Sequence, residues 1–319
     1  LISFYGGSYD TTMDFMNVVA PSPPSINRQH FLFNDAHLGS LNDLRTLKKN
    51  LTLTTNVNYL FDNQKSDSYA RRDIIIENGE NIRIEEDMNS RLLKRELEGA
   101  ITLEGNTDDY FLNNKVNVSA KWNDESGDVR AGQDVLQRLA LPSLHAANSF
   151  EYLRRTGKRR LRLQSDISYT TQDNQLRVKP SLFGNLSGNP VETDSSLMQA
   201  VSYNRFATNT SASGSIEGKV SFWYSGGVFT NHYKFNSSLY EGVNTSPLPA
   251  DSLRNNLARG EIGFRVSPGM RITITEKFRP YITLPVTCLL LDKNDRVRQT
   301  DGRKEYWLVS PGLHVEYPI

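Results

Sequence analysis

Cysteine, long apolar runs and an excess of charge of either sign are all scarce in this sequence. Cys288 is the single cysteine, which excludes an internal disulfide and a cysteine-based metal cluster. Mean hydropathy is -0.52 and no apolar run approaches the roughly 20 residues of a spanning helix, so an α-helical membrane protein is excluded. With a net charge of +1, the chain as a whole does not attract nucleic acid, and no nucleic-acid partner is expected.

Recognisable catalytic and metal-binding motifs are missing as well. The five histidines are spread over the chain, and none lies within four residues of another, so the helical spacing of a zinc site is absent. Neither a GxSxG nucleophile elbow nor a GxxxxGK[ST] phosphate loop occurs. We therefore expect a protein that is not an enzyme and has no catalytic, cofactor-binding or metal-binding residues. The sequence assigns no ligand-contacting residue.

The run 262–274 alternates strictly between apolar and small or hydrophilic residues. Its even positions are Ile, Phe, Val, Pro, Met, Ile and Ile, and its odd positions are Gly, Arg, Ser, Gly, Arg and Thr. Side chains of a strand point to alternate faces, so one face here is apolar and the other polar. At about 3.3 Å per residue this strand would span roughly 40 Å, well beyond the usual strand length. The pattern is typical of a wall between lipid and a polar lumen.

Similar alternation predicts about a dozen antiparallel strands. The strand-like runs are 1–5, 30–44, 51–61, 93–103, 112–122, 144–153, 161–169, 198–207, 216–224, 262–274, 280–291 and 307–317, with one more candidate at 228–239. Short polar turns at 46–50, 106–109, 155–158, 208–214 and 276–279 alternate with polar excursions at 62–90, 123–139 and 172–196. The first excursion has its own hairpin signal around Glu77-Asn78-Gly79-Glu80.

A meander with short turns on one side and long excursions on the other is typical of an outer-membrane barrel. The apolar faces are then expected to contact lipid, at Val57, Ile101, Val118, Ile167, Phe264 and Ile272, with Cys288 as a small residue of the same face. Aromatic residues near strand ends fit interfacial girdles, at Tyr59, Phe61, Trp122, Tyr169, Phe222 and Tyr224. A soluble β-sandwich also alternates its faces and is the alternative fold.

Several short segments resemble the corresponding segments of a known family. They are Phe31-Leu32-Phe33-Asn34-Asp35-Ala36-His37, Ser40-Leu41-Asn42, Leu97-Glu98-Gly99-Ala100, Leu103-Glu104-Gly105-Asn106-Thr107-Asp108, Leu284-Pro285-Val286 and Val309-Ser310-Pro311-Gly312-Leu313. With these segments, most of the chain resembles the barrel of TonB-dependent outer-membrane receptors, in the variety with an N-terminal carboxypeptidase-regulatory-like domain and a plug. The resemblance implies nutrient uptake driven through TonB, substrate capture by long extracellular loops, and as partners outer-membrane lipid, TonB, an intramolecular plug and a surface-exposed substrate-binding lipoprotein.

Family members are much longer than this chain, and such transporters have about 22 strands. Neither the plug nor the N-terminal domain is recognisable, and both ends of the chain fall in strand-like sequence. We therefore expect 1–319 to be one partial domain of a larger transmembrane antiparallel up-and-down β-barrel, in the outer membrane of a Gram-negative bacterium. The alternatives are a complete barrel of about 12 strands that acts as a passive pore or an enzyme, and a soluble β-rich module that binds glycans.

Overall fold

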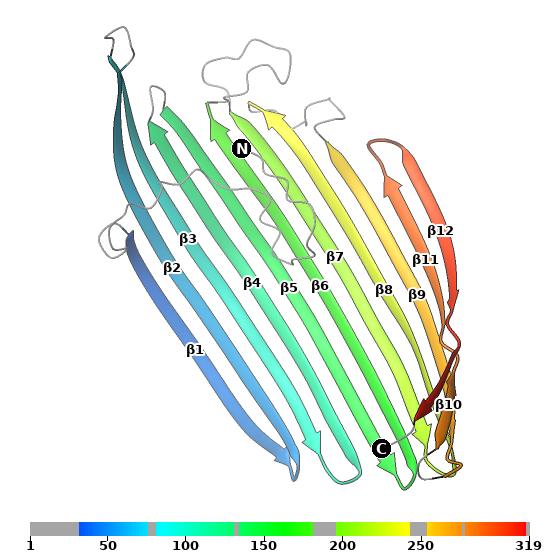
Figure 1. The fold of residues 1–319 in the computed structure, drawn as a ribbon. Helices are drawn as coiled ribbons and strands as arrows, with labels where there is room; N and C mark the ends of the chain where they lie inside the picture. Colours follow the sequence, from blue (N-terminus) through cyan, green and yellow to red (C-terminus); the bar gives the residue numbers. More distant parts are fainter. Residues whose placement is uncertain are drawn as a thin grey trace.

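The chain is all-β and forms a single antiparallel sheet. The computed structural model describes residues 32–75, 81–130, 134–180, 196–242, 254–275 and 278–316. These ranges hold thirteen strands and no helix long and apolar enough to cross a membrane (Figure 1). The strands are β1 (Leu32–Lys48), β2 (Leu51–Ile75), β3 (Asn81–Asn106), β4 (Tyr110–Arg130), β5 (Asp134–Thr156), β6 (Arg159–Lys179), β7 (Leu197–Ile216), β8 (Val220–Glu241), β9 (Asn255–Ile272), β10 (Arg279–Thr283), β11 (Val286–Asp295), β12 (Thr300–Val309) and β13 (Gly312–Glu316).

Consecutive strands lie side by side, so the sheet is an up-and-down meander. Each strand from β1 to β9 pairs antiparallel with the next, and β9 pairs with both β10 and β11. The last two pairs are β10 with β13 and β11 with β12. β1 lies at one edge, β12 and β13 together form the other, and no described residues join these edges (Figure 1). The expected antiparallel meander of about a dozen strands is confirmed, as an open sheet within the described ranges.

The tight turns gather at one end of the sheet. They lie at 49–50, 107–109, 157–158 and 217–219, between β1 and β2, β3 and β4, β5 and β6, and β7 and β8. We call this the lower end, as Figure 1 draws it, and the opposite end the upper end. The predicted gathering of these four turns on one side is therefore confirmed, but the short turn 296–299 between β11 and β12 lies at the upper end, so the sorting is not complete. The strand expected at 1–5 lies outside the described residues.

Two of the three polar excursions are mostly strands rather than loops; of the third, 172–196, residues 181–195 lie outside the described residues. β2 and β3 continue through all of 62–90 except 76–80, and β4 and β5 likewise cover most of 123–139. The hairpin expected inside the first excursion is confirmed, with Ile74 opposite Ile82. The expectation of long loops here is wrong because polar residues, typical of loops, continue to pair across strands that extend beyond the apolar part of the sheet.

The turn expected at 208–214 is also wrong. β7 runs through this Thr-, Ser- and Gly-rich stretch to Ile216, pairs on both sides, and turns only at 217–219. The additional strand considered at 228–239 is the upper part of β8. Small polar residues are common in turns, but pairing with β6 and β8 keeps these residues extended in a central strand.

Two prolines interrupt the strands expected at 280–291 and 307–317. Pro285 separates β10 from β11, and Pro311 separates β12 from β13. A proline has no backbone N–H, so it cannot complete a ladder of hydrogen bonds. The break is bridged by two backbone bonds: Leu284 N–H donates to the Pro268 carbonyl at 3.0 Å, and Ser310 N–H donates to the Pro285 carbonyl at 3.0 Å. The two family-like segments containing Pro285 and Pro311 therefore lie against each other.

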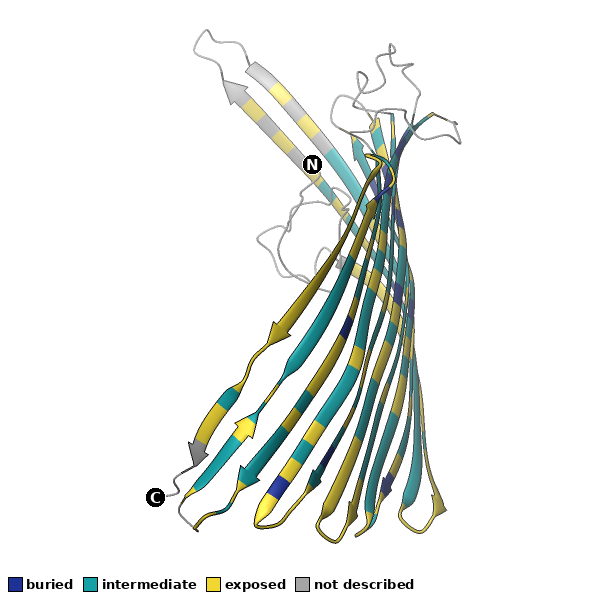
Figure 2. Ribbon diagram, turned by 90° about the vertical axis from the view of Figure 1, so that its right-hand side faces the viewer, coloured by how far each residue is buried: buried dark blue, intermediate teal, exposed yellow. Residues whose placement is uncertain are grey.

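The sheet is a single layer with very few buried residues. Figure 2 shows exposed residues recurring along every strand, with buried residues only in places. The buried apolar side chains of the described part are Ala120, Leu139, Leu197, Val201 and Leu239. Within the described ranges no second layer covers either face, so both faces of the sheet are available to their surroundings.

Candidate functional site: the two faces of the sheet

Register assigns every strand residue to one of two faces. Residues directly opposite each other across neighbouring strands point to the same face. Phe264 on β9 lies opposite Val228 on β8 and Cys288 on β11. We call the face that holds Phe264 face A, and the face that holds its neighbour Arg265 face B. Cys288 thus lies on the apolar face, as predicted.

The lower half of face A is covered by exposed apolar side chains, which we call the apolar band. Its members are at least 36% exposed although they are large and hydrophobic. On strands β2 to β9 and on β12 they include Tyr59, Leu97, Ile101, Val116, Val118, Trp122, Leu144, Leu161, Ile167, Tyr169, Phe206, Ile216, Phe222, Tyr224, Val228, Ile262, Phe264, Val266, Ile272, Trp307 and Val309. Contiguous exposure on this scale identifies a surface that water does not normally face.

Five of the six residues expected to contact lipid are exposed in this band. They are Ile101, Val118, Ile167, Phe264 and Ile272, with exposures between 38% and 48%. Val57 lies on the same face, opposite Leu41 and Gly99, and is half-buried. The predicted placement of these side chains on one open face is confirmed; their contact with lipid stays a prediction.

Aromatic rings mark both limits of the apolar band. Tyr59, Trp122 and Tyr169 lie near its upper limit on β2, β4 and β6. At its lower limit Tyr110 and Tyr152 stack across β4 and β5, with ring centroids 6.3 Å apart. Tyr and Trp favour the two interfaces of a bilayer because one end of each ring is apolar and the other polar. The band therefore has the girdles that its sequence predicts.

The band also fixes the tilt of the strands. Following the paired residues from strand to strand, Leu51 on β2 is level with Val266 on β9. The lower limit of the band is at Leu51 on β2 but at Ile272 on β9, six residues below Val266. The limit therefore descends by six residues across these strands. Six residues are about 20 Å along a strand, and seven strand spacings are about 34 Å, so the strands tilt by about 30° from the normal of the band. This is close to the roughly 35–45° of outer-membrane barrels.

The lower half of face B is polar and cross-linked. Arg162 on β6 pairs with Glu151 on β5 at 2.8 Å, and Asp166 accepts a hydrogen bond from Ser149 at 2.7 Å. Lys121 lies 3.6 Å from Glu96. Opposite charges therefore pair across neighbouring strands, and Arg162 and Asp166 each bind a residue of β5.

A polar hollow of about 640 Å³ lies on face B over β4 to β9. Its floor consists of small residues such as Ala147, Ser168 and Ala207, which lie directly opposite one another across β5, β6 and β7. Glu261 and Arg265 form its side on β9, four residues apart on one face. Neither has a charged partner among the described residues, so this hollow can bind a surface that carries both charges and hydrogen-bonding groups.

The upper half of the sheet reverses this polarity. There the apolar side chains lie on face B, where Leu139 and Val201 form a small core with Leu141, Leu176 and Phe235. Face A is polar at the same height, with Asn89, Arg91, Asp124, Ser126, Arg138, Gln175, Arg177, Lys234 and Asn236. The sequence reasoning missed this reversal because it treated these segments as loops.

No candidate metal centre is present in the described ranges. No three His, Cys, Asp or Glu side chains of those ranges come together. His37 lies 3.1 Å from Asp35, and His145 Nδ1 lies 2.9 Å from the Thr170 hydroxyl. His30 lies outside the described residues.

The comparisons with known proteins add little to this geometry. No protein-family model matches the chain, and no curated protein matches it by sequence. Among solved structures it is similar to the outer membrane protease OmpT from Escherichia coli, with 10% identity over 91% of this chain and 97% of that chain. The TM-score is 0.24. A likeness this weak supports no conclusion about this chain, so its function is argued from its own two faces.

Proposed function

We propose that this sheet is the wall of an outer-membrane β-barrel in a Gram-negative bacterium, with face A toward lipid and face B toward the lumen. The apolar band carries the proposal. On β4 the band extends from Tyr110 to Trp122, about 40 Å along the strand and about 34 Å along the bilayer normal at a tilt of about 30°. A bilayer has a hydrocarbon core of about 30 Å.

Pairing of backbone groups supports a barrel larger than the described sheet. Lipid offers no hydrogen bonds to an unpaired N–H or C=O, so a sheet in a bilayer has to be closed. The edges at β1 and β12 are not paired by described residues. We infer that further strands complete the wall.

The barrel acts in TonB-dependent uptake of a nutrient rather than in catalysis. Two observations support this choice: the family-like segments, and a lumen face that suits a polar plug. Besides the hollow, Asp62 Oδ1, Asn113 Oδ1 and Arg279 Nε are buried polar atoms of this chain without hydrogen-bond partners among the described residues. A plug surface would supply such partners, since buried polar atoms are usually paired. TonB would provide the energy, and a surface-exposed lipoprotein would help to present the substrate.

The upper end faces outward in this proposal. Outer-membrane barrels have short periplasmic turns, and the turns at 49–50 and 107–109 are short. A cysteine in place of Asp67 should react with an impermeant label on intact cells, in a variant lacking Cys288. A cysteine in place of Lys49 or Asp108 should react only after the outer membrane is made permeable. The opposite labelling would mean that the upper end faces the periplasm, and the proposal of a barrel wall would still stand.

Uptake with and without TonB tests the function. Cells making the full-length protein should take up at least one of a panel of labelled siderophores, cobalamin, glycans and peptides, and should lose this uptake when TonB is deleted. Uptake that continues without TonB, together with steady ion conductance of the purified protein in planar bilayers, would instead identify a passive pore.

A further inference from the structure

Four cationic side chains form a row on face A above the apolar band. The row crosses six neighbouring strands, and its members lie directly opposite one another from β2 to β7. From β2 to β7 the six residues at this level are Lys65, Arg91, Ser126, Arg138, Arg177 and Met198, of which the lysine and the three arginines are cationic. We call this the cationic row; it contains no carboxylate.

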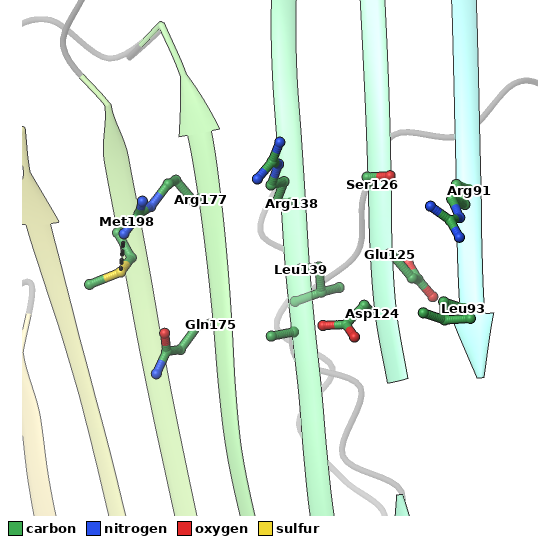
Figure 3. A pocket seen from close by; sticks show the side chains of 11 residues that line it. Arg91, Leu93, Asp124, Glu125, Ser126, Arg138, Leu139, Gln175, Arg177 and Met198 are labelled. Atoms are coloured by element: carbon green, nitrogen blue, oxygen red, sulfur yellow. Dashed lines mark hydrogen bonds between the residues drawn. The ribbon is translucent and has the colours of Figure 1, made fainter. Parts of the chain in front are cut away.

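The cationic row borders a hollow of about 380 Å³ (Figure 3). Figure 3 shows Arg91, Arg138 and Arg177 at one height on three strands, with Asp124 and Gln175 below them. All three arginine side chains are exposed. The hollow is therefore open to an anion that arrives from the outer side of the wall.

The arginines of the row keep most of their hydrogen-bond donors free. Arg91 donates to Asn63 Oδ1 at 2.8 Å, and Arg177 contacts the sulfur of Met198 at 3.7 Å. Arg138 makes no hydrogen bond or ion pair with any described residue. A guanidinium has five N–H donors and commonly binds a phosphate through two of them.

Three carboxylates of face A flank the row, and two of them are paired with an arginine. Asp67 and Asp128 lie one step above it, in a hollow with Lys65 and Arg91, and Asp128 is 3.7 Å from Arg130 above the row. Asp124 lies one step below it, where Arg95 forms an ion pair with its Oδ2. Arg95 also donates to the Trp122 carbonyl at 3.2 Å, which holds it beside the upper limit of the band. Glu125 borders the hollow as well, although its register places it on face B opposite Leu139. The row thus keeps a positive excess.

Height separates the row from an ordinary lipid headgroup. Lys65 lies four residues above Phe61 and Arg177 eight residues above Tyr169, about 13 and 26 Å along the strands. With a tilt near 30–40°, these are about 10 and 20 Å above the aromatic limit of the band. The headgroup layer of a phospholipid bilayer adds only about 5–8 Å on each side of the hydrocarbon core.

We propose that the cationic row binds the phosphates of a glycolipid whose headgroup is a phosphorylated oligosaccharide and whose acyl chains lie on the apolar band below. Such a headgroup is deep enough to place phosphates at the height of the row. The cations form two pairs, Lys65 with Arg91 and Arg138 with Arg177, whose centres are about 14 Å apart across the strands. The row can therefore hold two phosphates of one headgroup.

This inference rests on the proposed function, because it needs face A in a bilayer and the upper end outside. Binding of a membrane-derived anion also fits the general attraction of Arg and Lys clusters for anionic headgroups. What the row adds is a fixed geometry: the cations are held on paired strands rather than on loops.

Native mass spectrometry of the full-length protein in detergent tests the proposal. The probes are lipopolysaccharide with a phosphorylated core, the same lipopolysaccharide after enzymatic removal of phosphate, phosphatidylglycerol, and inorganic phosphate. The test variant is R91Q/R138Q/R177Q. The matched control, R154Q/R155Q/R159Q, removes the same charge from the turn between β5 and β6 at the lower end.

We expect the phosphorylated lipopolysaccharide to bind the test variant at least tenfold more weakly than the parent, and the control variant within about twofold of the parent. Dephosphorylation should weaken binding to the parent by a similar factor. Equal losses in both variants, equal dependence of phosphatidylglycerol binding on the row, or full competition by millimolar inorganic phosphate would each overturn the proposal.

The parent protein's behaviour in bilayers separates this failure from failure of the proposed function. A parent that inserts and becomes protease-resistant, yet binds all lipids alike, contradicts only the cationic row. A parent that does not insert contradicts the outer-membrane wall itself. The test variant is first checked for the same insertion, and R138Q alone, expected to weaken binding severalfold, replaces it if the triple variant does not fold.

Discussion

On β5, the lower residue Leu144 turns its apolar side chain to face A, whereas higher on the same strand Arg138 occupies face A and Leu139 turns to face B. The same reversal occurs on β6, β7 and β8, where Leu176, Val201 and Phe235 turn to face B. In the proposed wall, one continuous strand would serve two environments: below the aromatic limit its outer side would meet a medium without water, and above it water or charged headgroups. The inner side of the upper half forms a small core. Strand pairing is shared, and only the side-chain pattern changes.

The strands are long because each has a lower half in the apolar band and an upper half beyond it. A strand of about 9–11 residues is enough to cross a bilayer at 45°. β2 has 25 residues and β3 has 26, so more than half of each lies outside the apolar band. In the proposed orientation, the upper halves would extend the wall beyond the membrane, where the sheet could position groups that bind molecules from outside.

The largest expected effect comes from charge placed in the apolar band. Phe264→Arg should lower the free energy of unfolding in a bilayer by about 2–4 kcal/mol, because a guanidinium near the midplane loses its hydration. The neighbouring change Arg265→Phe, on face B, should cost far less. Urea unfolding of the full-length protein in liposomes measures both. Equal costs would mean that the two faces meet similar surroundings.

A core substitution in the upper half comes next. Leu139 is 1% exposed, so Leu139→Ala should destabilise by about 2 kcal/mol, the low end for a buried leucine, since its cluster is small. Leu136 on face A of the same strand is 37% exposed and is the matched control. If Leu136→Ala proved as costly as Leu139→Ala, the upper halves would have no inner core.

A smaller effect is expected where an aromatic ring covers a glycine on face B. A Cβ at Gly263 would overlap the ring of Phe229, its direct neighbour on β8. Gly263→Ala should cost about 1 kcal/mol because the ring has to move out of a packed position. Gly99→Ala, with open space around the new methyl group, should be nearly neutral in the same unfolding measurement.

The smallest effect concerns pH at the upper end of β11. Hydrogen bonds from the Arg298 side chain and backbone lower the pKa of Asp295 from its usual 3.8, with a further bond from the Val297 N–H. Because the folded pKa is the lower one, this stabilisation is present above pH 3.8 and is lost as the pH falls through the lowered value.

Hydrogen exchange in the turn 296–299 measures this loss. The full-length protein should protect the turn better than Asp295→Asn at pH 6, and the difference should vanish in strong acid. A difference that persists unchanged at the lowest pH would show that the carboxylate does not hold the turn.

Much of the fold is predictable because alternation and pairing depend on nearest neighbours. The pattern around Phe264 and Arg265 identifies the strand, its two faces and the class of fold. The turn at 107–109 follows from Asn-Thr-Asp-Asp between two apolar runs. Tertiary context decides the rest: the stretch 208–214 has turn-like composition, yet pairing on both sides keeps it in β7.

The cationic row could be predicted only if the pairing register of β2 to β7 were known. Lys65, Arg138 and Arg177 lie in segments whose composition resembles loops, far apart in the sequence. Alternation within each segment places them on face A, but only the pairing of β2 to β7 brings them level. Their exposed charges therefore look unremarkable in the sequence and become a row in the sheet.

Site-directed spin labelling along β9 tests the assignment of the two faces most directly. Nitroxides placed singly at 262–272, in a full-length variant with Cys288→Ser, are compared in liposomes for collision with oxygen, which dissolves in lipid, and with a polar nickel chelate. Oxygen collisions should peak at the even positions from Ile262 to Ile272 and the nickel chelate at the odd positions, with period two. Absence of alternation, or oxygen maxima at Arg265 and Arg271, would contradict a lipid-facing face A.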